Sequence, residues 1–359
     1  VLPEWLNRFG VSPSQGGQLF SLYYLSYVVI TFFGGVLSDL AGEKWVLTLS
    51  QIFLLVGFST ISLADHFSTL RWGMLLMGLG GGFCEAPLTG LVSKVFTGEE
   101  GYALNVSQIS FGLGAASGPF LMGFFLSRGI SWRLLYLVSG FVSLLLLVLF
   151  VTDKTLFVVS RETQEKRNWL ALLNFRNLLL SSFLAIFLYV GAEIGSSAWM
   201  ITYLVRELRA SIYVGGVAMA IFWGAITVGR LLFAQLSRFF SSSSLLRFAV
   251  GISLVFLVLL NVTRRVDLAL FALGGMGFGY SSIWPFIVAN VARKVDDLQA
   301  TAIGFTVAFG GIGALFFPWL MGIWIDALNL RSIFVLVLVL VMALFLVVRG
   351  HNFREERGK

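Results

Sequence analysis

The strongest constraint on the fold is a series of apolar stretches that recurs along almost the whole chain. A helix needs about 20 mostly apolar residues to cross a bilayer. Eleven stretches meet this requirement, and the short segments between them hold most of the charge. Their approximate bounds are 18–38, 45–64, 69–92, 103–127, 132–151, 178–204, 213–238, 245–262, 268–291, 300–325 and 331–348. The sequence therefore predicts an all-α polytopic membrane protein.

The composition excludes several other classes of protein. Of the 359 residues, 58% are hydrophobic and only 12% are charged, whereas soluble domains have about 25% charged residues. The chain therefore has too little polar surface for a soluble enzyme, and its single cysteine, Cys84, cannot build a disulfide scaffold. The sequence contains no nucleotide-binding loop and no metal-ligand constellation. We expect no catalysis, no cofactor and no bound metal.

The positive charges predict an orientation in the membrane. If the long polar segment 153–177 lies in the cytoplasm, fifteen Lys and Arg residues fall on the cytoplasmic side and eight on the outer side. Such a bias is typical of membrane proteins, so we attribute the net charge of +7 to orientation and not to nucleic acid. We expect a multi-pass protein of the bacterial inner membrane with a cytoplasmic C-terminus.

An internal repeat divides the chain into two halves. Residues 112–123 and 311–322 are identical at seven of twelve positions, at an offset of 199. The same offset aligns Gly78 and Gly80 with Gly277 and Gly279. One register that fits several helix pairs predicts two homologous bundles. The expected parts are an N-terminal bundle (1–152), a central cytoplasmic loop (153–177), a C-terminal bundle (178–348) and a cytoplasmic tail (349–359).

The repeat also predicts a helix that this chain lacks. The stretch 178–204 opens the second half, and its counterpart at the same offset would lie before Val1. We therefore expect two bundles of six helices, with the first helix missing from this chain and eleven spans present. The alternative is a true eleven-span protein.

One polar motif and one arginine resemble a known superfamily. Residues 35–44 read Gly-Val-Leu-Ser-Asp-Leu-Ala-Gly-Glu-Lys, and Arg71 opens a later span. The motif resembles the signature between the second and third helices of the major facilitator superfamily, although Leu40 and Glu43 replace its usual basic residues. An arginine at the position of Arg71 is also typical. The resemblance implies two six-helix bundles related by a pseudo-twofold axis, and transport by alternating access.

Further motifs resemble the fucose/proton symporter group of that superfamily. They are Cys84-Glu85-Ala86-Pro87-Leu88-Thr89, Leu104-Asn105-Val106-Ser107-Gln108, Tyr189-Val190-Gly191-Ala192-Glu193, Phe222-Trp223-Gly224 with Gly229-Arg230, and Ser282-Ile283-Trp284-Pro285. Thr89 departs from the asparagine of that group. The likeness spans the whole chain and implies proton-coupled sugar symport.

Two acidic residues within spans are our candidate proton-coupling residues. A charge at mid-helix costs about 2.5–3.5 kcal/mol, so Glu85, Glu193 and Arg230 need a partner or a watery cavity. A buried carboxyl group that reaches water on one side can bind and release a proton, and the resemblance implies this role for Glu85. At the offset of 199, Glu85 aligns with Trp284, so the carboxylate is not part of the shared scaffold. The alternatives are a Glu85 neutralised by a neighbouring polar group and an ion pair between Glu193 and Arg230.

Five residues are candidates for binding a sugar. Trp199, Trp223 and Trp284 lie within spans, away from the interfaces where tryptophan concentrates. A pyranose packs a flat C–H face on aromatic rings and needs hydrogen bonds for its hydroxyls. Asn105 and Gln108 are three residues apart and share a helix face. The alternatives are packing for the tryptophans and structural hydrogen bonds for the two amides.

Four charged residues are candidates for gating or ion pairing. The resemblance implies that Asp39 and Lys44 form a conformational latch between the halves, although they could be solvated loop charges. Arg71 and Arg230 are basic residues that lie within expected spans.

We interpret the chain as a monomeric secondary active transporter in the lipid bilayer. Its partners would be a small-molecule substrate and H⁺, or Na⁺ in its place, without nucleic acid. The favoured function is proton-coupled sugar symport. The alternatives are proton-driven efflux of drugs or lipids, and a non-transporting membrane sensor or gene remnant.

Overall fold

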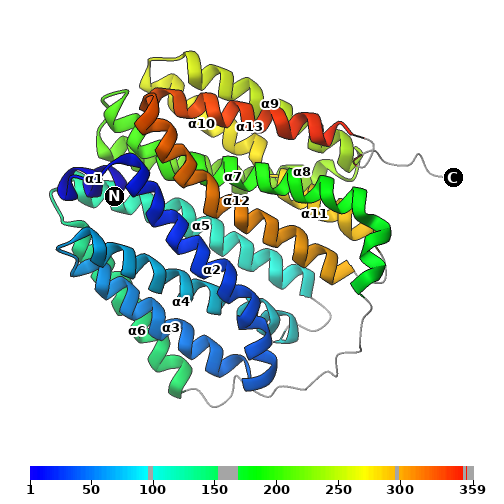
Figure 1. Ribbon diagram of the computed structural model, residues 1–359, viewed down its shortest axis with the longest axis horizontal. Helices are drawn as coiled ribbons and strands as arrows, with labels where there is room; N and C mark the ends of the chain where they lie inside the picture. The colour runs from blue at the N-terminus through cyan, green and yellow to red at the C-terminus, as the bar shows by residue number, and fades with distance from the viewer. Residues whose placement is uncertain (96–99, 153–168, 296–298, 351–352, 354–359) are drawn as a thin grey trace.

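The computed structural model describes residues 1–95, 100–152, 169–295, 299–350 and 353 (Figure 1). Within these ranges, the structure does not describe the side chains of some helical residues, namely 32, 34–36, 39–41, 86, 89–95, 100–109, 169–171 and 299–301. The described residues form helices and connecting turns, without strands. The elements are α1 (Leu2–Phe9), α2 (Pro13–Ala41), α3 (Glu43–Ser62), α4 (Phe67–Val95), α5 (Glu100–Ser127), α6 (Trp132–Thr152), η1 (Trp169–Phe175), α7 (Arg176–Arg206), α8 (Ile212–Leu236), α9 (Ser242–Val262), α10 (Val266–Tyr280), α11 (Ile283–Lys294), α12 (Gln299–Ala327), η2 (Leu330–Ser332) and α13 (Ile333–Val348).

The predicted all-α membrane fold is confirmed. Each of the eleven apolar stretches lies on helix, and nine helices of the described chain are long and apolar enough to cross a membrane. Two features differ from the prediction. The stretch 268–291 is divided into α10 and α11, and the polar N-terminal segment contains the short helix α1.

The start of α2 shows how the sequence fixes a helix end. The Ser12 side chain accepts a hydrogen bond from the backbone N–H of Gln15, and the Gln15 side chain accepts one from the backbone N–H of Ser12. Such a capping box satisfies two N–H groups that lack a partner within the helix. At the repeat offset of 199, Ser211 caps α8 through the N–H of Val214. The two halves therefore begin these helices in the same way.

Two crossing contacts join the halves of the molecule. α2 packs along α12, and α5 packs along α8, while α3, α4 and α6 lie on one side and α9, α10 and α13 on the other (Figure 1). The helix α1 lies between the two sides. Its Leu2 and Leu6 belong to the larger apolar core, built mainly from α7–α13, whereas Trp5 packs on Trp132 and Tyr136 in the core of the other side.

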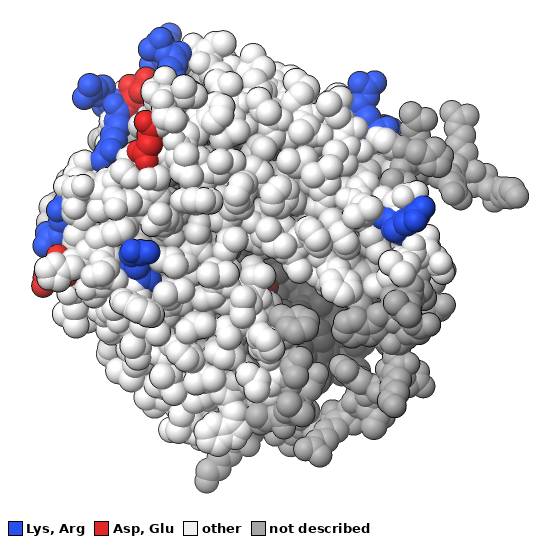
Figure 2. Space-filling view, viewed as in Figure 1, with Lys and Arg blue, Asp and Glu red and all other residues white. Residues whose placement is uncertain are grey.

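The charge distribution matches a membrane-embedded molecule. Figure 2 shows blue and red side chains toward the left of the view and blue ones at the right, separated by a broad band whose outer surface is uncharged. Uncharged surface in the middle is what a hydrocarbon layer requires, because charged side chains are costly there. The multi-pass prediction agrees with this distribution.

Candidate functional site

The halves are held tightly together at one end, which we call the closed end. It contains the start of α2, the end of α12, the end of α5 and the start of α8. A Cβ atom built on Gly17 would lie 2.6 Å from the carbonyl oxygen of Pro318, and one on Gly322 would lie 2.6 Å from that of Pro13. The Ser21 hydroxyl also donates a hydrogen bond of 2.6 Å to the carbonyl oxygen of Leu315. Backbone therefore touches backbone between α2 and α12.

The contact between α5 and α8 is the repeat of the contact between α2 and α12. A Cβ atom on Gly216 would lie 2.8 Å from the carbonyl oxygen of Pro119, and one on Gly123 would lie 2.9 Å from that of Ile212. Gly216 corresponds to Gly17 at the offset of 199, and Gly123 to Gly322. The internal repeat has thus produced two equivalent seals, which we call the glycine seals.

A hollow opens between the helices away from the closed end. Figure 2 shows it at the lower right of the face, with part of an acidic side chain visible inside. Glu85 on α4 and Phe111 on α5 are both exposed. An exposed carboxylate within a membrane span meets the first requirement for a proton-binding residue of a carrier.

Glycines of α4 bring α2 against Glu85. Gly78 contacts the backbone carbonyl of Tyr23, and a Cβ atom on Gly82 would lie 2.6 Å from the carbonyl oxygen of Tyr27. Gly78 and Gly82 are four residues apart and so share one face of α4. Glu85 follows three residues later on the same face. The glycines therefore allow the close approach that places the tyrosines of α2 beside the carboxylate.

Three tyrosines of α2 form an aromatic cluster next to Glu85. The ring centroids of Tyr23 and Tyr24 are 5.0 Å apart, and those of Tyr23 and Tyr27 are 5.9 Å apart. The Tyr27 hydroxyl forms a hydrogen bond with Glu85. Tyr24 lies within electrostatic range of Glu193 on α7. The cluster therefore spans the space between the two candidate carboxylates.

Glu193 is held in a buried hydrogen-bonded group. Its side chain is 8% exposed, and Tyr189, one turn earlier on α7, is 1% exposed. The Tyr189 hydroxyl lies 2.7 Å from Oε1 of Glu193 and 3.0 Å from the backbone carbonyl oxygen of Tyr280 on α10. Glu193 thus differs from Glu85, which is exposed.

Tyr280 is the last residue of α10, next to the break between α10 and α11. Residues 281 and 282 form a turn, and Ile283 begins α11. Pro285 has no N–H group and cannot donate to the carbonyl of Ser281, which favours an interruption here. Carbonyl groups freed by a broken membrane helix need other donors. Tyr189 supplies one to the carbonyl of Tyr280.

The alternative of an ion pair between Glu193 and Arg230 is not realised in this conformation. Within the described part of the chain, the salt bridges shorter than 4.0 Å do not include these two residues. Arg230 is half-buried on α8, and its Nε atom is buried without a hydrogen-bond partner. The guanidinium nevertheless lies within electrostatic range of Glu193.

The three candidate tryptophans occupy different environments. Trp199 is fully buried, and its indole N–H donates a hydrogen bond of 2.9 Å to the carbonyl oxygen of Pro318. Trp223 is 8% exposed and packs edge to face on Phe111 of α5, with 6.0 Å between ring centroids. Trp284 is 36% exposed at the start of α11. Only Trp223 joins the two halves at an aromatic contact.

Other candidate residues lie apart from the carboxylates or outside the described side chains. Asp39, Asn105 and Gln108 lie on helix, but their side chains are outside the described set. The Lys44 ammonium lies 3.5 Å from the carbonyl oxygen of Val151, near the end of α6, where a positive charge favours the helix dipole. Arg71 is exposed near the start of α4.

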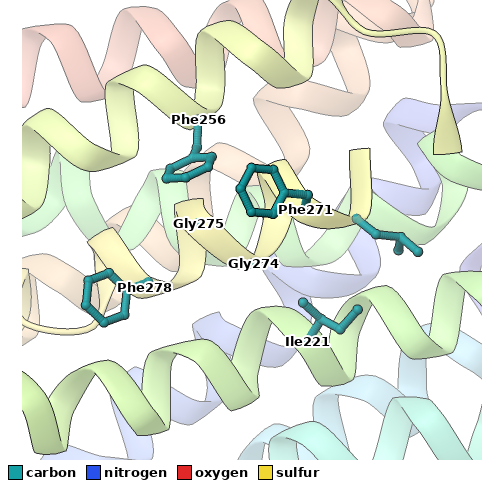
Figure 3. Close-up of a pocket in the computed structure, with 7 residues that line it drawn as sticks. Ile221, Phe256, Phe271, Gly274, Gly275 and Phe278 are labelled. Atoms are coloured by element: carbon teal, nitrogen blue, oxygen red, sulfur yellow. The ribbon is translucent and has the colours of Figure 1, made fainter. Parts of the chain in front are cut away.

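Two cavities lie outside the carboxylate region. One, of about 490 Å³, lies between α8, α9 and α10 (Figure 3) and is lined by Ile221, Phe256, Leu270, Phe271, Gly274, Gly275 and Phe278. The other, of about 420 Å³, contains Arg71 with Gln18 and Ser21 of α2 and Trp319 of α12. The first offers no polar side chain to orient a solute. No group of three or more metal-ligating side chains occurs in the described residues.

Reasoning from the sequence missed the tyrosines of the site. Tyr23, Tyr24 and Tyr27 lie within the first predicted span, and tyrosine usually concentrates at the membrane interface. Their spacing of one and three residues clusters them on one side of a helix. A tryptophan search found Trp223, whereas a search for every polar aromatic residue within spans would also have found these tyrosines and Tyr280.

The chain matches the family model described as Major Facilitator Superfamily over residues 1–273. A TsgA homolog of Buchnera aphidicola is 23% identical over 316 residues, which cover 88% of this chain and 81% of that protein. The quinolone resistance protein NorA of Staphylococcus aureus is 22% identical over 340 residues, or 91% of this chain and 84% of that protein.

Solved structures of transporters share the fold. A bacterial homolog of the human lysosomal transporter Spinster, in an inward-facing and unoccupied conformation, superposes with a TM-score of 0.80 at 14% identity. This match covers 100% of the present chain and 94% of the other. A variant of the nucleoside transporter NupG also gives a TM-score of 0.80, at 12% identity, with 98% and 94% covered. The specific likeness to fucose/proton symporters is not among these similarities.

Proposed function

Because the chain belongs to the major facilitator superfamily, we propose that it moves a small hydroxylated solute across the membrane together with protons. The observation that carries this proposal is the placement of Glu85. The carboxylate is exposed and contacts the Tyr27 hydroxyl. It lies on a helix whose glycines pack closely against α2. Such a group can exchange a proton with water on one side of the membrane at a time.

The aromatic residues near Glu85 and at the contact between α5 and α8 favour a solute with a ring. Tyr23, Tyr24 and Tyr27 supply hydroxyls and ring faces from α2, and Trp223 supplies a ring face from α8. Sugars need both kinds of contact, because their C–H faces pack on rings while their hydroxyls take hydrogen bonds. We therefore favour sugar-type symport and assign substrate contact to these four residues. Trp199, which is buried behind α12, serves packing.

Proton-driven efflux of aromatic or amphipathic compounds is the second candidate. Phe111 is 56% exposed, and Phe33 is 52% exposed. An aromatic lining suits apolar substrates as well as sugars. The relative that confers quinolone resistance is similar over 91% of this chain. Such a carrier would use the same exposed carboxylate for protons.

The proposal is tested with cells that express the full-length protein in weakly buffered suspension. Addition of one sugar from a panel is expected to raise the external pH, because symport removes protons from the medium. Glu85→Gln is expected to abolish this change and uphill accumulation, while exchange of labelled solute across equal concentrations persists. Asp267→Asn, at an exposed outer turn, is the matched control and is expected to behave as the unchanged protein.

Two results would overturn the symport proposal. Uphill accumulation that persists in Glu85→Gln would remove the coupling role of Glu85. If no sugar changes the external pH, while ethidium is extruded in a proton-dependent manner, the protein is an efflux carrier instead.

A further inference from the structure

The hydrogen bonds around Tyr189 require one proton more than its hydroxyl supplies. A tyrosine hydroxyl has a single hydrogen to donate, whereas a backbone carbonyl and an ionised carboxylate can only accept. The Tyr189 oxygen lies 2.7 Å from Oε1 of Glu193 and 3.0 Å from the carbonyl oxygen of Tyr280. If Glu193 were ionised, these two acceptors would compete for one hydrogen. Both contacts are satisfied when Glu193 itself carries a proton and donates it to Tyr189.

The surroundings of Glu193 favour the protonated form in this conformation. The carboxyl group is buried among α7, α8 and α10, and an isolated buried charge is costly. The titratable groups that face it are Tyr189 on its own helix, Tyr280 on α10, Tyr24 on α2 and Arg230 on α8. Arg230 is the charged group among them, and it does not contact the carboxylate within 4.0 Å.

Tyr280, which accepts a hydrogen bond from Tyr189, lies where a membrane helix is interrupted. Tyr280 is the last residue of α10. Its backbone carbonyl accepts a hydrogen bond from the Tyr189 hydroxyl instead of one from a backbone N–H of α11. When Glu193 loses its proton, the carboxylate attracts the Tyr189 hydrogen, because hydrogen bonds to charged acceptors are stronger than those to neutral ones. The Tyr280 carbonyl then loses its donor. Arg230, whose Nε lacks a partner, becomes the available counter-charge for Glu193.

We propose that Glu193 is a second proton-binding site, and that the Tyr189 hydroxyl couples its protonation to the break between α10 and α11. This inference rests on the proposed proton-coupled function and deepens it. Glu193 binds the proton, Tyr189 is a positioning residue, and the junction at residues 281–282 is the part of the backbone that responds. The proton on Glu193 keeps the junction in the geometry of the present conformation. When the proton is released, the Glu193 carboxylate pairs with the Arg230 guanidinium.

The protonation of Glu193 is tested by infrared spectroscopy of the full-length protein in lipid vesicles, without any substrate. The C=O stretching band of a protonated carboxylic acid is expected at neutral pH and is expected to vanish in Glu193→Gln. Glu85→Gln keeps the band. Tyr189→Phe is expected to keep the C=O band, shifted to the frequency of a carboxylic acid that lacks the hydrogen bond to Tyr189. Tyr203→Phe, on the same helix and equally buried, is the matched control and leaves the band in place. A spectrum of Glu193→Gln identical to that of the unchanged protein would overturn the proposal.

Coupling to the helix break is tested by hydrogen–deuterium exchange in residues 278–288. After correction for the intrinsic pH dependence of exchange, deprotonation is expected to speed exchange at the junction by about two- to tenfold, the effect of one ordinary hydrogen bond. Glu193→Gln and Tyr189→Phe are expected to abolish this pH dependence. A pH dependence that persists in both variants would refute the coupling.

The two proposals can fail separately. The infrared and exchange measurements need no transported solute, so a flat response to every sugar leaves them informative. Conversely, a missing Glu193 band would overturn the second proton site and leave the assignment of Glu85 intact.

Discussion

The two halves of the molecule share a scaffold and differ in the chemistry placed on it. Gly78 of α4 meets the carbonyl of Tyr23, and Gly277 of α10 meets that of Phe222, at the same offset of 199. The side chains around these contacts have diverged. Tyr24 in one half corresponds to Trp223 in the other. Close helix packing is therefore common to both halves. At these positions only the first half carries tyrosine hydroxyl groups.

The divergence extends to the backbone near the carboxylates. The helix α4 continues through Glu85 and beyond Pro87, whereas its counterpart is interrupted between α10 and α11. Glu85 is exposed, and Glu193 is enclosed with Tyr189. The comparison teaches that the repeat conserves contacts between helices, while function depends on the positions where the halves differ.

The largest expected effect concerns the glycine seals, where the halves are equivalent. Gly17→Ala and Gly216→Ala would each place a methyl group within 2.8 Å of a backbone carbonyl. Overpacking of this kind costs about 1–3 kcal/mol, or about 5- to 150-fold in an equilibrium constant. We expect each variant to shift the protein toward a form opened at the closed end, and to a similar extent.

This shift is measured as a distance distribution by pulsed electron resonance. Spin labels would be attached at Ser127→Cys and Glu207→Cys in a Cys84→Ala background, across the closed end. Gly114→Ala and Gly118→Ala are matched controls, because a Cβ atom at either position would meet nothing within 4 Å. Unchanged distances in both seal variants would contradict the role of the seals. A shift in only one would show that the two seals are not equivalent.

A smaller effect distinguishes a packing tryptophan from one that contacts substrate. Trp199→Phe removes the hydrogen bond to Pro318 and part of a fully buried ring. We expect a loss of stability of about 1–3 kcal/mol without a change in apparent substrate affinity. Trp223→Phe is expected to lower that affinity several-fold and to leave the melting temperature nearly unchanged. Thermal unfolding in detergent measures the stability, and concentration-dependent uptake measures the apparent affinity. If Trp199→Phe lowered the affinity and Trp223→Phe lowered the stability, Trp199 would contact the substrate and Trp223 would serve packing.

The smallest expected effect compares exposed ion pairs at the closed end. The Arg133 guanidinium, 2.7 Å from Asp65, lowers the pKa of that carboxyl, and the Arg265 guanidinium lowers the pKa of Asp267. Each pair therefore stabilises the folded state fully at pH values above the ordinary pKa of an unfolded aspartate. That contribution is lost as the pH falls through the lowered pKa. Exposed pairs contribute little, so both Arg→Gln variants are expected to melt nearly as the unchanged protein does.

Of the two, Arg133→Gln is expected to have the larger effect. Arg133 also donates a hydrogen bond of 2.7 Å to the carbonyl oxygen of Ala64, so it links the end of α3 to the start of α6. The Arg265–Asp267 pair joins residues two apart. Melting curves at neutral pH and in mild acid test the difference, and a larger loss for Arg265→Gln would contradict it.

Most of the fold could be predicted because a bilayer restricts the possibilities. Apolar length fixed the helices, and the bounds agree within a few residues, as for the stretch 132–151 and α6 (Trp132–Thr152). The break at residues 281–282 was missed because apolar composition is the same for one helix or two. Pro285 signals an interruption, yet α4, α5 and α12 continue through internal prolines. Tertiary contacts decide which proline interrupts a helix.

The site was harder to predict than the fold. The sequence identified Glu85 and Glu193 as costly intramembrane charges, but not their different exposure, which depends on how α2 and α7 pack. The suggested Glu193–Arg230 ion pair depends on a few ångströms between helices, which spacing along the chain does not define. Tyr189 belonged to a recognised motif, and only the three-dimensional arrangement shows that it contacts α10.

The glycine seals have a consequence for how dissolved salt acts on the closed end. Within the described residues, each of the two salt bridges joins residues of the same half, and the seals themselves consist of glycine, proline and backbone atoms. Charged groups bond across the closed end beside the seals: the Asp326 carboxylate accepts a hydrogen bond from the backbone N–H of Ser14, and the Arg206 guanidinium donates one to the Asn7 side chain. Dissolved ions screen exposed charges over about 10 Å at 0.1 M, and they do not weaken van der Waals contact in the same way. The contribution of the glycine seals to closing is therefore expected to change little with ionic strength, whereas that of the charged hydrogen bonds beside them would weaken in salt.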